Sequence, residues 1–330
     1  MIDTRVALAL EAGSAVLPPD GLIAVFRPPA QARLDRLPKD RTEIIVDARP
    51  DYDLWQARGF RCTVDPQESY AGAIVIIPRA KAEARALIAK ASALTGGALV
   101  IDGQKTDGVD SLLREMRKRV VVEGPISKAH GKLFWINRSD DVSFEDWVAG
   151  PALTPGGFWT APGVFSADGI DPASALLVET LPDDLGPCVA DLGAGWGFLS
   201  AHILTRPEVR EVHLVEAGHM ALACAQHNVT DARAHFHWAD ATTWQPAEAL
   251  DTIVMNPPFH AGRKADPSLG QGFVEAAARL LKPQGQLFMV ANRHLPYEAT
   301  LHRLFTNCAE IDGDSRFKVF HASRPRRTHR

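Results

Sequence analysis

Apolar runs and helical stretches alternate along the whole chain. Short runs of apolar and β-branched residues, each followed by turn residues, predict buried parallel strands. Longer stretches rich in alanine, leucine and charged residues predict helices between them. In the first half the predicted strands cover residues 22–26, 43–47, 73–77, 98–101, 120–122 and 133–136, and the predicted helices cover residues 80–94 and 110–119.

The second half repeats this alternation with clearer turn signals. Its predicted strands cover residues 188–192, 211–216, 234–238, 251–256 and 286–291, and its helices cover residues 198–204, 221–228 and 271–281. Alternation at this spacing predicts an α/β fold with open, doubly wound parallel sheets. A cluster of prolines, glycines and acidic residues around positions 140–160 predicts the boundary between two domains, residues 1–145 and 146–330.

The two halves also resemble each other. In each, a strand ending in proline is followed by an alanine-rich helix and then by a glycine and an apolar strand, over residues 74–101 and again over residues 253–289. Duplication of one α/β domain explains this repeat, although general α/β punctuation remains an alternative. Asn256 in the second copy aligns with the apolar Ile77 in the first, and no predicted strand of the first half precedes a glycine-rich turn. We therefore expect the first copy to be degenerate.

Composition narrows the class of protein. The chain has 330 residues, of which 46% are hydrophobic and 23% charged, as in ordinary globular domains. The net charge of −4 excludes a uniformly basic nucleic-acid binder but allows a local basic surface. We expect no secretory signal and no membrane span, because no apolar run approaches about 18 residues. The four cysteines are scattered and predict buried free thiols in a cytoplasmic protein: Cys62, Cys188, Cys224 and Cys308.

A glycine-rich loop, residues 191–197, follows one predicted strand and opens a helix. Such a loop turns tightly and exposes backbone N–H groups to a ligand. Phe198 stands at the sixth position, where a dinucleotide-binding loop needs a small residue, so NAD and FAD are disfavoured. Glu216, 21 residues after Gly195, ends the next predicted strand, where a carboxylate can accept hydrogen bonds from ribose hydroxyls.

These features resemble the S-adenosylmethionine (SAM) site of class I methyltransferases. The resemblance implies SAM as the cofactor, and it implies that Asp191, Gly193, Gly195 and Glu216 bind it. In that class a residue at the position of Asp240 commonly faces the adenine amino group. A solvated loop aspartate is the alternative for Asp240.

The segment from Asn256 to His260 carries the most information about a reaction. A predicted strand ends in Asn256-Pro257-Pro258-Phe259. Proline has no N–H and fixes φ, so the turn is rigid and leaves carbonyl groups free. The Asn256 side chain and a proline carbonyl can then accept hydrogen bonds from one exocyclic –NH₂ group, while Phe259 offers a ring face for stacking a base. This pattern matches the NPPF/NPPY signature of amino-group methyltransferases.

The same segment indicates a mechanism. The lone pair of the guanine amino group is delocalised into the ring, so acceptors that hold both N–H hydrogens can orient the nitrogen for direct displacement. Proximity supplies the remainder of the catalysis, and no serine or cysteine nucleophile is needed. His260 is the only nearby side chain that titrates near neutral pH and could accept the proton. A structural role or an RNA contact is the alternative for His260.

Longer strings resemble the two-domain bacterial rRNA guanine-N2 methyltransferases, which include a 16S enzyme (RsmC type) and a 23S enzyme (RlmG type). The resemblance implies two tandem Rossmann-like class I methyltransferase domains, the N-terminal one degenerate, and N2-methylation of one guanine in ribosomal RNA. It implies that Phe165 and Ser166 border the pocket, that Asn256 also contacts the cofactor, and that Asn256, Pro257 and Phe259 hold the base. The matching strings are residues 103–109, 162–171, 256–260, 290–297 and 316–319.

Two of these strings favour different substrates. Residues 168–171 favour the 16S type, and residues 291–294 are similar to the 23S type, so we expect 16S rRNA with 23S rRNA as the alternative. Trp196, a bulky residue inside the glycine loop, departs from the usual pattern.

Basic residues predict where RNA binds. Residues 316–330 contain six arginines and lysines and no acid, which favours a phosphate-binding arm over a disordered tail. A guanine inside an RNA helix would have to be flipped out to reach the pocket. The charged helix face at residues 114–119 is a weaker candidate. The predicted RNA-binding residues are Arg263 and Lys264, after the reaction motif, and Arg324, Arg326 and Arg327 in the arm.

No metal site is expected, because His235 and His237 share a strand face without a clustered third ligand in the sequence. We expect a monomer that binds ribosomal RNA or the 30S subunit, without a membrane. Three other functions compete with this one. A protein glutamine-amide methyltransferase uses a similar turn but more often has tyrosine after Pro-Pro and a helical accessory domain. A non-catalytic assembly factor would not need Asn256 or an intact loop, and a dehydrogenase would need NADH.

Overall fold

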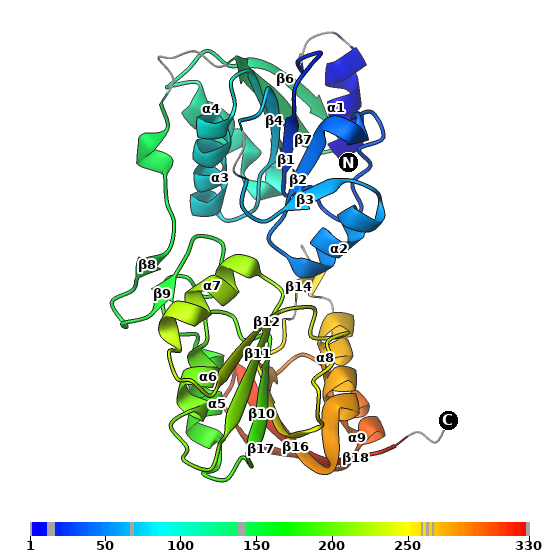
Figure 1. The fold of residues 1–330 in the computed structure, drawn as a ribbon, viewed down its shortest axis with the longest axis vertical. Helices are drawn as coiled ribbons and strands as arrows, with labels where there is room; N and C mark the ends of the chain where they lie inside the picture. Colours follow the sequence, from blue (N-terminus) through cyan, green and yellow to red (C-terminus); the bar gives the residue numbers. More distant parts are fainter. Residues whose placement is uncertain are drawn as a thin grey trace. The chain divides into compact units, whose positions relative to one another are not determined.

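The chain forms two compact units, residues 1–150 and 151–330, in a computed structural model (Figure 1). The structure describes residues 2–11, 17–66, 69–137, 143–258, 260–261, 264–265 and 267–327. Among these residues, no helix has the length and apolar character needed to cross a membrane.

Unit 1 is a seven-stranded sheet with helices on both faces. Its strands are β1 (Ile23–Phe26), β2 (Thr42–Ile45), β3 (Arg61–Thr63), β4 (Gly72–Ile76), β5 (Ala98–Gln104), β6 (Glu123–Lys128) and β7 (Gly131–Asn137). Its helices are α1 (Ile2–Glu11), α2 (Arg49–Ala57), α3 (Lys81–Leu94) and α4 (Val109–Met116), with short 3₁₀ turns η1 (Lys39–Arg41), η2 (Lys105–Asp107) and η3 (Glu145–Trp147). Helices α1 and α2 pack on one face, and α3 and α4 pack on the other.

Unit 2 repeats the architecture. Its main strands are β10 (Cys188–Leu192), β11 (Glu211–Glu216), β12 (Ala234–Trp238), β13 (Leu250–Met255), β16 (Leu281–Asn292), β17 (Phe305–Gly313) and β18 (Phe317–Pro325). The short strands β8 (Ala152–Leu153) and β9 (Trp159–Thr160) form one hairpin, and β14 (His260–Ala261) and β15 (Lys264–Ala265) form another. Helices α5 (Pro172–Thr180), α6 (Phe198–Ile203) and α7 (His219–Asn228) cover one face of the main sheet, and α8 (Pro267–Leu280) and α9 (Glu298–Leu304) cover the other (Figure 1).

The two sheets have the same topology. The strand order is β3-β2-β1-β4-β5-β7-β6 in unit 1 and β12-β11-β10-β13-β16-β18-β17 in unit 2. Numbered within each unit, both orders are 3-2-1-4-5-7-6. In each, the first five strands of the unit pair in parallel, and the seventh strand enters antiparallel between the fifth and the sixth. The prediction of two tandem Rossmann-like domains is confirmed, and the shared order supports duplication.

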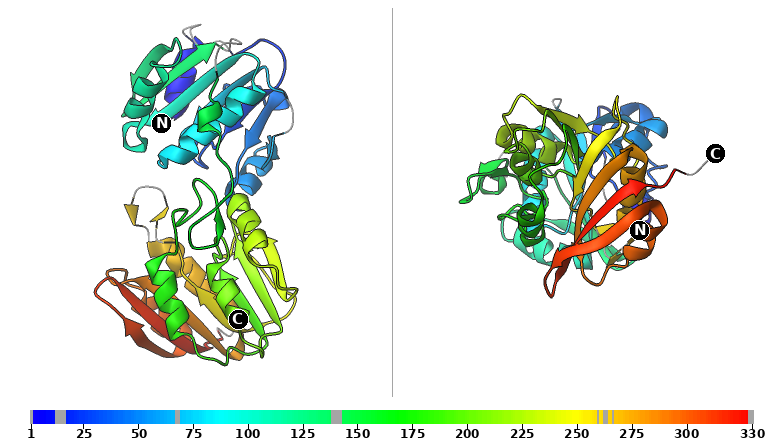
Figure 2. Two further views of the ribbon diagram at one scale, coloured as in Figure 1. Left: turned by 90° about the vertical axis from the view of Figure 1, so that its left-hand side faces the viewer. Right: turned by 90° about the horizontal axis from the view of Figure 1, so that it is seen from below.

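One predicted strand, residues 120–122, is wrong. Residues 120–122 form no strand. They are followed by β6, which pairs with β7. Val120 and Val122 instead pack against the core beneath α3 and α4, so their apolar character reflects loop packing rather than strand pairing. The sequence did not predict how β16, β17 and β18 of unit 2 pair with one another. These strands are coloured orange to red at one edge of the sheet in the right view of Figure 2.

The equivalent of the glycine loop is absent from unit 1. There, β1 continues into Arg27, Pro28 and Pro29, and the buried Trp55 donates a hydrogen bond from Nε1 to the carbonyl oxygen of Pro28 at 3.1 Å. Ile77, which follows β4 as Asn256 follows β13, is buried in the core. Apolar packing therefore occupies both positions where unit 2 carries polar groups.

The cysteine prediction holds in part. All four thiols are free. Cys188 and Cys224 are buried, whereas Cys62 and Cys308 are only half-buried because they lie on strands near the sheet edges.

Candidate active site

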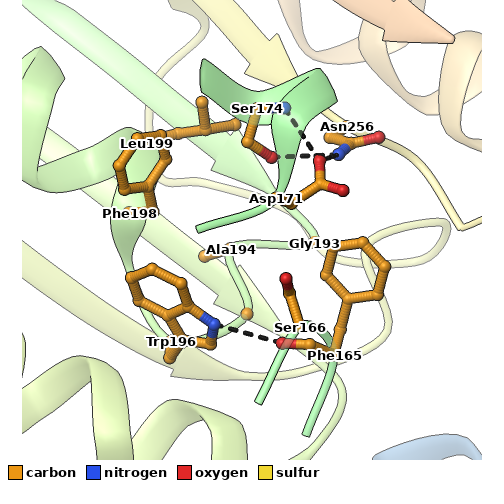
Figure 3. A pocket seen from close by; sticks show the side chains of 11 residues that line it. Phe165, Ser166, Asp171, Ser174, Gly193, Ala194, Trp196, Phe198, Leu199 and Asn256 are labelled. Carbon is orange, nitrogen blue, oxygen red and sulfur yellow. Dashed lines mark hydrogen bonds between the residues drawn. The ribbon is translucent and has the colours of Figure 1, made fainter. Parts of the chain in front are cut away.

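The carboxyl ends of β10 and β13 converge on a cavity in unit 2 that is open to solvent (Figure 3). This edge of a parallel sheet is where α/β folds bind ligands. The lining comes from three segments that are distant in the sequence: the stretch before and at the start of α5, the glycine loop after β10, and the end of β13. The lining residues are Phe165, Ser166, Asp171, Ser174, Gly193, Ala194, Gly195, Trp196, Phe198, Leu199 and Asn256.

The glycine loop has backbone angles that require glycine. Gly195 has φ +55°, and a Cβ built on it would meet no atom within 4 Å, so the loop leaves open space for a ligand. Gly197 has φ +90°, and a Cβ there would lie 3.0 Å from Cγ2 of Val229. The last glycine therefore permits close packing of the loop against the end of α7, and the middle one faces free volume.

The carboxylate of Glu216 supports the loop from the end of β11. Its Oε2 accepts a hydrogen bond from the Gly195 N–H at 2.8 Å, and its Oε1 accepts one from the Gly218 N–H at 2.7 Å. The carboxylate thus holds two backbone N–H groups beside the loop, and Glu216 is not among the residues that line the cavity. The parallel pairing of β10 with β11 brings Glu216 and Gly195 together across 21 residues of chain.

Asp191 lies deeper than the sequence pattern indicated. It is fully buried and is absent from the cavity lining. Its Oδ2 accepts a hydrogen bond from Ser200 Oγ at 2.7 Å, while Oδ1 has no hydrogen-bond partner among the described residues. Desolvation, reinforced by the charge of Glu216, raises the pKa of Asp191 to about 7.

The bulky Trp196, which is unusual inside a glycine loop, has a structural role. Its ring is buried against Phe158 and Phe198, with ring centroids 4.8 and 5.7 Å away. Its Nε1 donates to the Phe165 carbonyl oxygen at 3.1 Å. This hydrogen bond joins the loop to the segment before α5, while the Phe165 ring itself remains 56% exposed beside the cavity (Figure 3).

Asn256 lines the cavity and has two polar neighbours. Its Nδ2 donates to Asp171 Oδ2 at 2.9 Å and to Ser174 Oγ at 3.0 Å (Figure 3). Pro257 beside it is buried, and Pro258 is exposed. Neither Asp171 nor Ser174 was predicted as a site residue. The available signal was the N-cap pattern Asp171-Pro172 followed by Ser174, since Asp171 Oδ2 also accepts the Ser174 N–H at 2.8 Å.

Other predicted site residues lie elsewhere or outside the described part. The Oδ1 atom of Asp240 accepts hydrogen bonds from the backbone N–H and the hydroxyl of Thr242, and Asp240 does not line the cavity. Phe259 and Arg263 lie outside the described residues, and only the backbones of His260 and Lys264, in β14 and β15, are described.

The predicted basic arm does not lie at the cavity. Residues 317–325 form β18 in the interior of the sheet, so the alternative of a disordered tail is wrong for them. Ser323 in β18 pairs with Gln286, which lies in the amino-terminal half of β16. The residues after Ser323 therefore lie at the amino ends of the parallel strands, opposite the glycine loop. These residues include Arg324, Arg326 and Arg327. The guanidinium groups of Arg326 and Arg327 donate to the carbonyl oxygens of Phe305 and Leu281.

A cluster of possible metal ligands also lies toward that opposite edge. Cys188, Glu211 and His213 each offer a ligand atom within 4.8 Å of the others, and His213 Nδ1 lies 3.0 Å from His237 Nε2. This cluster does not include His235 or His237, and it is formed by residues at the starts of β10 and β11 that the sequence analysis did not bring together. The expectation of no bound metal stays a prediction, and metal analysis of the purified protein tests it.

The residues present fit a SAM molecule. Gly195 leaves open volume, the Glu216 carboxylate lies at the end of β11 beside the loop, and the completely buried Asp191 carries an oxygen behind the loop without a partner among the described residues. The 3-2-1-4-5-7-6 strand order together with this loop defines a class I methyltransferase fold and site.

Comparison with known proteins identifies the family. The methyltransferase small domain family matches residues 156–321, and the chain belongs to it. It is 27% identical over 285 residues to the ribosomal RNA small subunit methyltransferase C of Idiomarina loihiensis, covering 82% of this chain and 84% of that protein. It is 29% identical over 248 residues to the ribosomal RNA large subunit methyltransferase G of Shewanella oneidensis, covering 70% of this chain and 64% of that longer protein.

A solved structure extends the likeness to both units. The Thermus thermophilus 16S rRNA N2 G1207 methyltransferase (RsmC), in complex with AdoMet and guanosine, has a TM-score of 0.78 and 25% sequence identity, covering 98% of this chain and 92% of that one. The predicted methyltransferase and its likeness to the RsmC and RlmG types are thereby confirmed.

Proposed function

We propose that this protein transfers the methyl group of SAM to the exocyclic N2 amine of one guanine in 16S ribosomal RNA. The observation that carries the proposal is the joining of Asn256, from the Asn-Pro-Pro turn, with the glycine loop in a single cavity. A small-subunit enzyme in complex with AdoMet and guanosine shares the fold over nearly the whole chain.

The residues of the site have distinct tasks in this proposal. Gly193, Gly195 and Glu216 would hold the cofactor, which supplies an electrophilic methyl group when bound. Asn256 Oδ1 would accept a hydrogen bond from the guanine amine and orient its nitrogen toward the cofactor side of the cavity. Because the glycine loop and Asn256 share one lining, binding alone brings the two reactants together, which is the main source of rate acceleration here.

The remaining steps concern stacking and the proton. Forming the new N–CH₃ bond breaks the sulfonium S–CH₃ bond and leaves one proton to be lost from the amine nitrogen. We propose that His260 or solvent accepts this proton and that Phe259 stacks on the base, as the NPPF motif suggests. Phe165, exposed at the rim of the cavity, is a second surface for stacking.

The choice between ribosomal subunits rests on relatives of both kinds. The RsmC-type relative from Idiomarina loihiensis is matched over 84% of its length, and the RlmG-type relative from Shewanella oneidensis is matched over 64%. That difference favours 16S rRNA, with 23S rRNA as the second candidate. The α/β architecture of unit 1 is unlike the helical accessory domain expected of a protein glutamine-amide methyltransferase.

We further propose that residues 1–145 recognise RNA or support the catalytic domain, and that the protein acts as a monomer in the cytoplasm, on naked rRNA or on the 30S subunit. A degenerate copy of the fold offers surface that a second subunit would otherwise supply. We propose that the basic side chains of Arg263 and Lys264 contact the RNA backbone near the target base. Arg324, Arg326 and Arg327, at the other sheet edge, would contact RNA remote from the target base.

Methyl transfer from labelled SAM tests the proposal. The substrates are 30S subunits, 50S subunits and naked rRNAs from a strain lacking the gene, with the modified nucleoside identified by mass spectrometry. N2-methylguanosine in 16S rRNA, lost in Asn256→Ala, is the expected result. The same nucleoside in 23S rRNA would reverse the substrate, and no label in any RNA while SAM still binds would refute the rRNA function.

A further inference from the structure

The amide of Asn256 is held in one orientation by two groups at the start of α5. Asp171 Oδ2 and Ser174 Oγ both lie within 3.0 Å of Asn256 Nδ2, although Asp171 is 85 residues away in the chain. No hydrogen bond to Asn256 Oδ1 occurs within the described part of the chain, and Figure 3 shows that oxygen directed away from Asp171. Among the described residues, the amide group therefore donates its hydrogen bonds to the protein, and its oxygen has no hydrogen-bond donor.

The opposite orientation is disfavoured by simple electrostatics. An ionised carboxylate has only acceptor sites. Rotating the amide by half a turn would put Asn256 Oδ1 against Asp171 Oδ2, so that two oxygens would face each other at the present 2.9 Å separation. The hydrogen bond lost is charge-assisted, which makes it stronger than one between neutral groups.

Asp171 is itself fixed by the helix that it caps. The same Oδ2 atom accepts the Ser174 N–H at 2.8 Å, which is the N-cap hydrogen bond of α5. The hydroxyl that also contacts Asn256 belongs to Ser174, whose side chain is buried. One short helical turn therefore presents two acceptors to the amide in a rigid arrangement.

We propose that Asp171 and Ser174 are positioning residues that make Asn256 an obligate hydrogen-bond acceptor toward the substrate. The cavity then selects a base that offers an N–H at this point, as the guanine amino group does, and rejects one that lacks it. This inference rests on the proposed function. It assigns the substrate specificity to the orientation of the Asn256 amide, which Asp171 and Ser174 set without contacting the reacting atoms.

The decisive variant is Asp171→Ser. Serine is a good N-cap residue, so α5 keeps its cap, but its hydroxyl sits one atom closer to the backbone and no longer reaches Asn256. We expect kcat for methyl transfer to fall at least about tenfold, in line with loss of a charge-assisted hydrogen bond. SAM affinity and the unfolding midpoint are expected to stay unchanged.

Three further variants separate positioning from folding. Asp171→Asn keeps an acceptor oxygen at the same reach and is expected to recover most of kcat. Ser174→Ala removes only the second acceptor and should give a smaller loss, and it remains informative if Asp171→Ser does not fold. The matched control is Asp168→Ser, an exposed aspartate of the same segment, which is expected to behave as the wild type.

A binding ratio reports the amide orientation directly. Guanosine and inosine differ by the 2-amino group, and their dissociation constants are measured on the full chain with S-adenosylhomocysteine present. The wild type should prefer guanosine by about fivefold, the value of one neutral hydrogen bond, and Asp171→Ser should bring the ratio close to one. A loss of stability alone would not change this ratio.

The outcomes distinguish the inference from the function on which it rests. If wild-type protein methylates guanine in rRNA but Asp171→Ser and Ser174→Ala match it in kcat and in the nucleoside ratio, the positioning role is refuted and the function stands. If the wild type methylates no RNA, the function fails. In that case an unchanged nucleoside ratio in Asp171→Ser would still refute the amide orientation.

Discussion

Replacing Glu216 with glutamine tests how the cofactor loop is held. The two carboxylate oxygens of Glu216 accept the N–H groups of Gly195 and Gly218 at 2.8 and 2.7 Å. Glutamine keeps one acceptor oxygen but turns an –NH₂ group toward the other N–H, so one hydrogen bond becomes a contact between two donors. The negative charge available for ribose hydroxyls is lost at the same time.

The size of the effect follows from these two bonds. A hydrogen bond to a charged group contributes about 1.5–3 kcal/mol, and about 1.4 kcal/mol corresponds to a tenfold change in an equilibrium constant. If the loss falls on binding, the Kd for SAM should rise by roughly 10- to 150-fold. Any part of the lost hydrogen-bond energy that affects the protein without SAM should appear as a lower free energy of unfolding, because the carboxylate holds the loop in the free protein as well.

Titration calorimetry with SAM, together with chemical denaturation of the free protein, measures both shares. Glu211→Gln is the matched control, because Glu211 starts the same strand at its other end, whereas Gly195 and Gly218 donate their hydrogen bonds to Glu216. A Glu216→Gln variant that binds SAM within about threefold of the wild type and unfolds at the same denaturant concentration would refute the assigned role of the carboxylate.

Three further predictions concern stability. Gly197→Ala should lower the stability of unit 2 by at least about 1–2 kcal/mol, because alanine must adopt φ +90° with its Cβ near Val229. The wild type should lose stability relative to Asp191→Asn as pH rises from about 4 to 7, by at most about 1.4 kcal/mol per pH unit. Asp102→Ala should destabilise unit 1 by about 3–5 kcal/mol, since it leaves the fully buried Arg5 without its charge partner.

The sign of the pH effect follows from the raised pKa of Asp191, about 7 against 3.8 for the ordinary side chain. Between these values the folded state holds a proton that the unfolded state has released, so stability falls as pH rises and levels off above about 7. Urea denaturation at several pH values measures this effect, and a difference from Asp191→Asn that stays constant with pH would contradict it.

The other two predictions have equally direct checks. Thermal denaturation follows Gly197→Ala, and an unchanged midpoint would mean that the loop adapts to a side chain. For the buried ion pair, the double variant Arg5→Met with Asp102→Leu should be far less destabilised than Asp102→Ala alone, because no unpaired charge remains. Equal losses in the two variants would contradict the electrostatic argument.

Much of the fold could be read from local pattern. Most of the parallel strands, and the helices α3, α4, α6, α7 and α8, follow from apolar runs and helical stretches that are complete within about ten residues. The glycine loop and the Asn-Pro-Pro turn are continuous in the sequence. Residues 120–122 were wrongly predicted as a strand, because an apolar run packs equally well as a loop against a helix pair. The strands β3, β6, β17 and β18 and the helices α1, α2, α5 and α9 had no prediction. Whether a short run pairs as a strand depends on a partner elsewhere in the chain.

The polarity of the site was decided only by tertiary structure. The sequence indicated Asn256 as a hydrogen-bonding residue, but its amide orientation depends on Asp171, which the fold brings 2.9 Å away from 85 residues earlier. The position of the basic arm also depended on tertiary structure. Its charge pattern does not predict the antiparallel pairing that puts Arg324 at the sheet edge opposite the loop. Chain-local periodicity determines elements and turns, whereas contacts between distant segments arise only when the sheet assembles and its strand order is set.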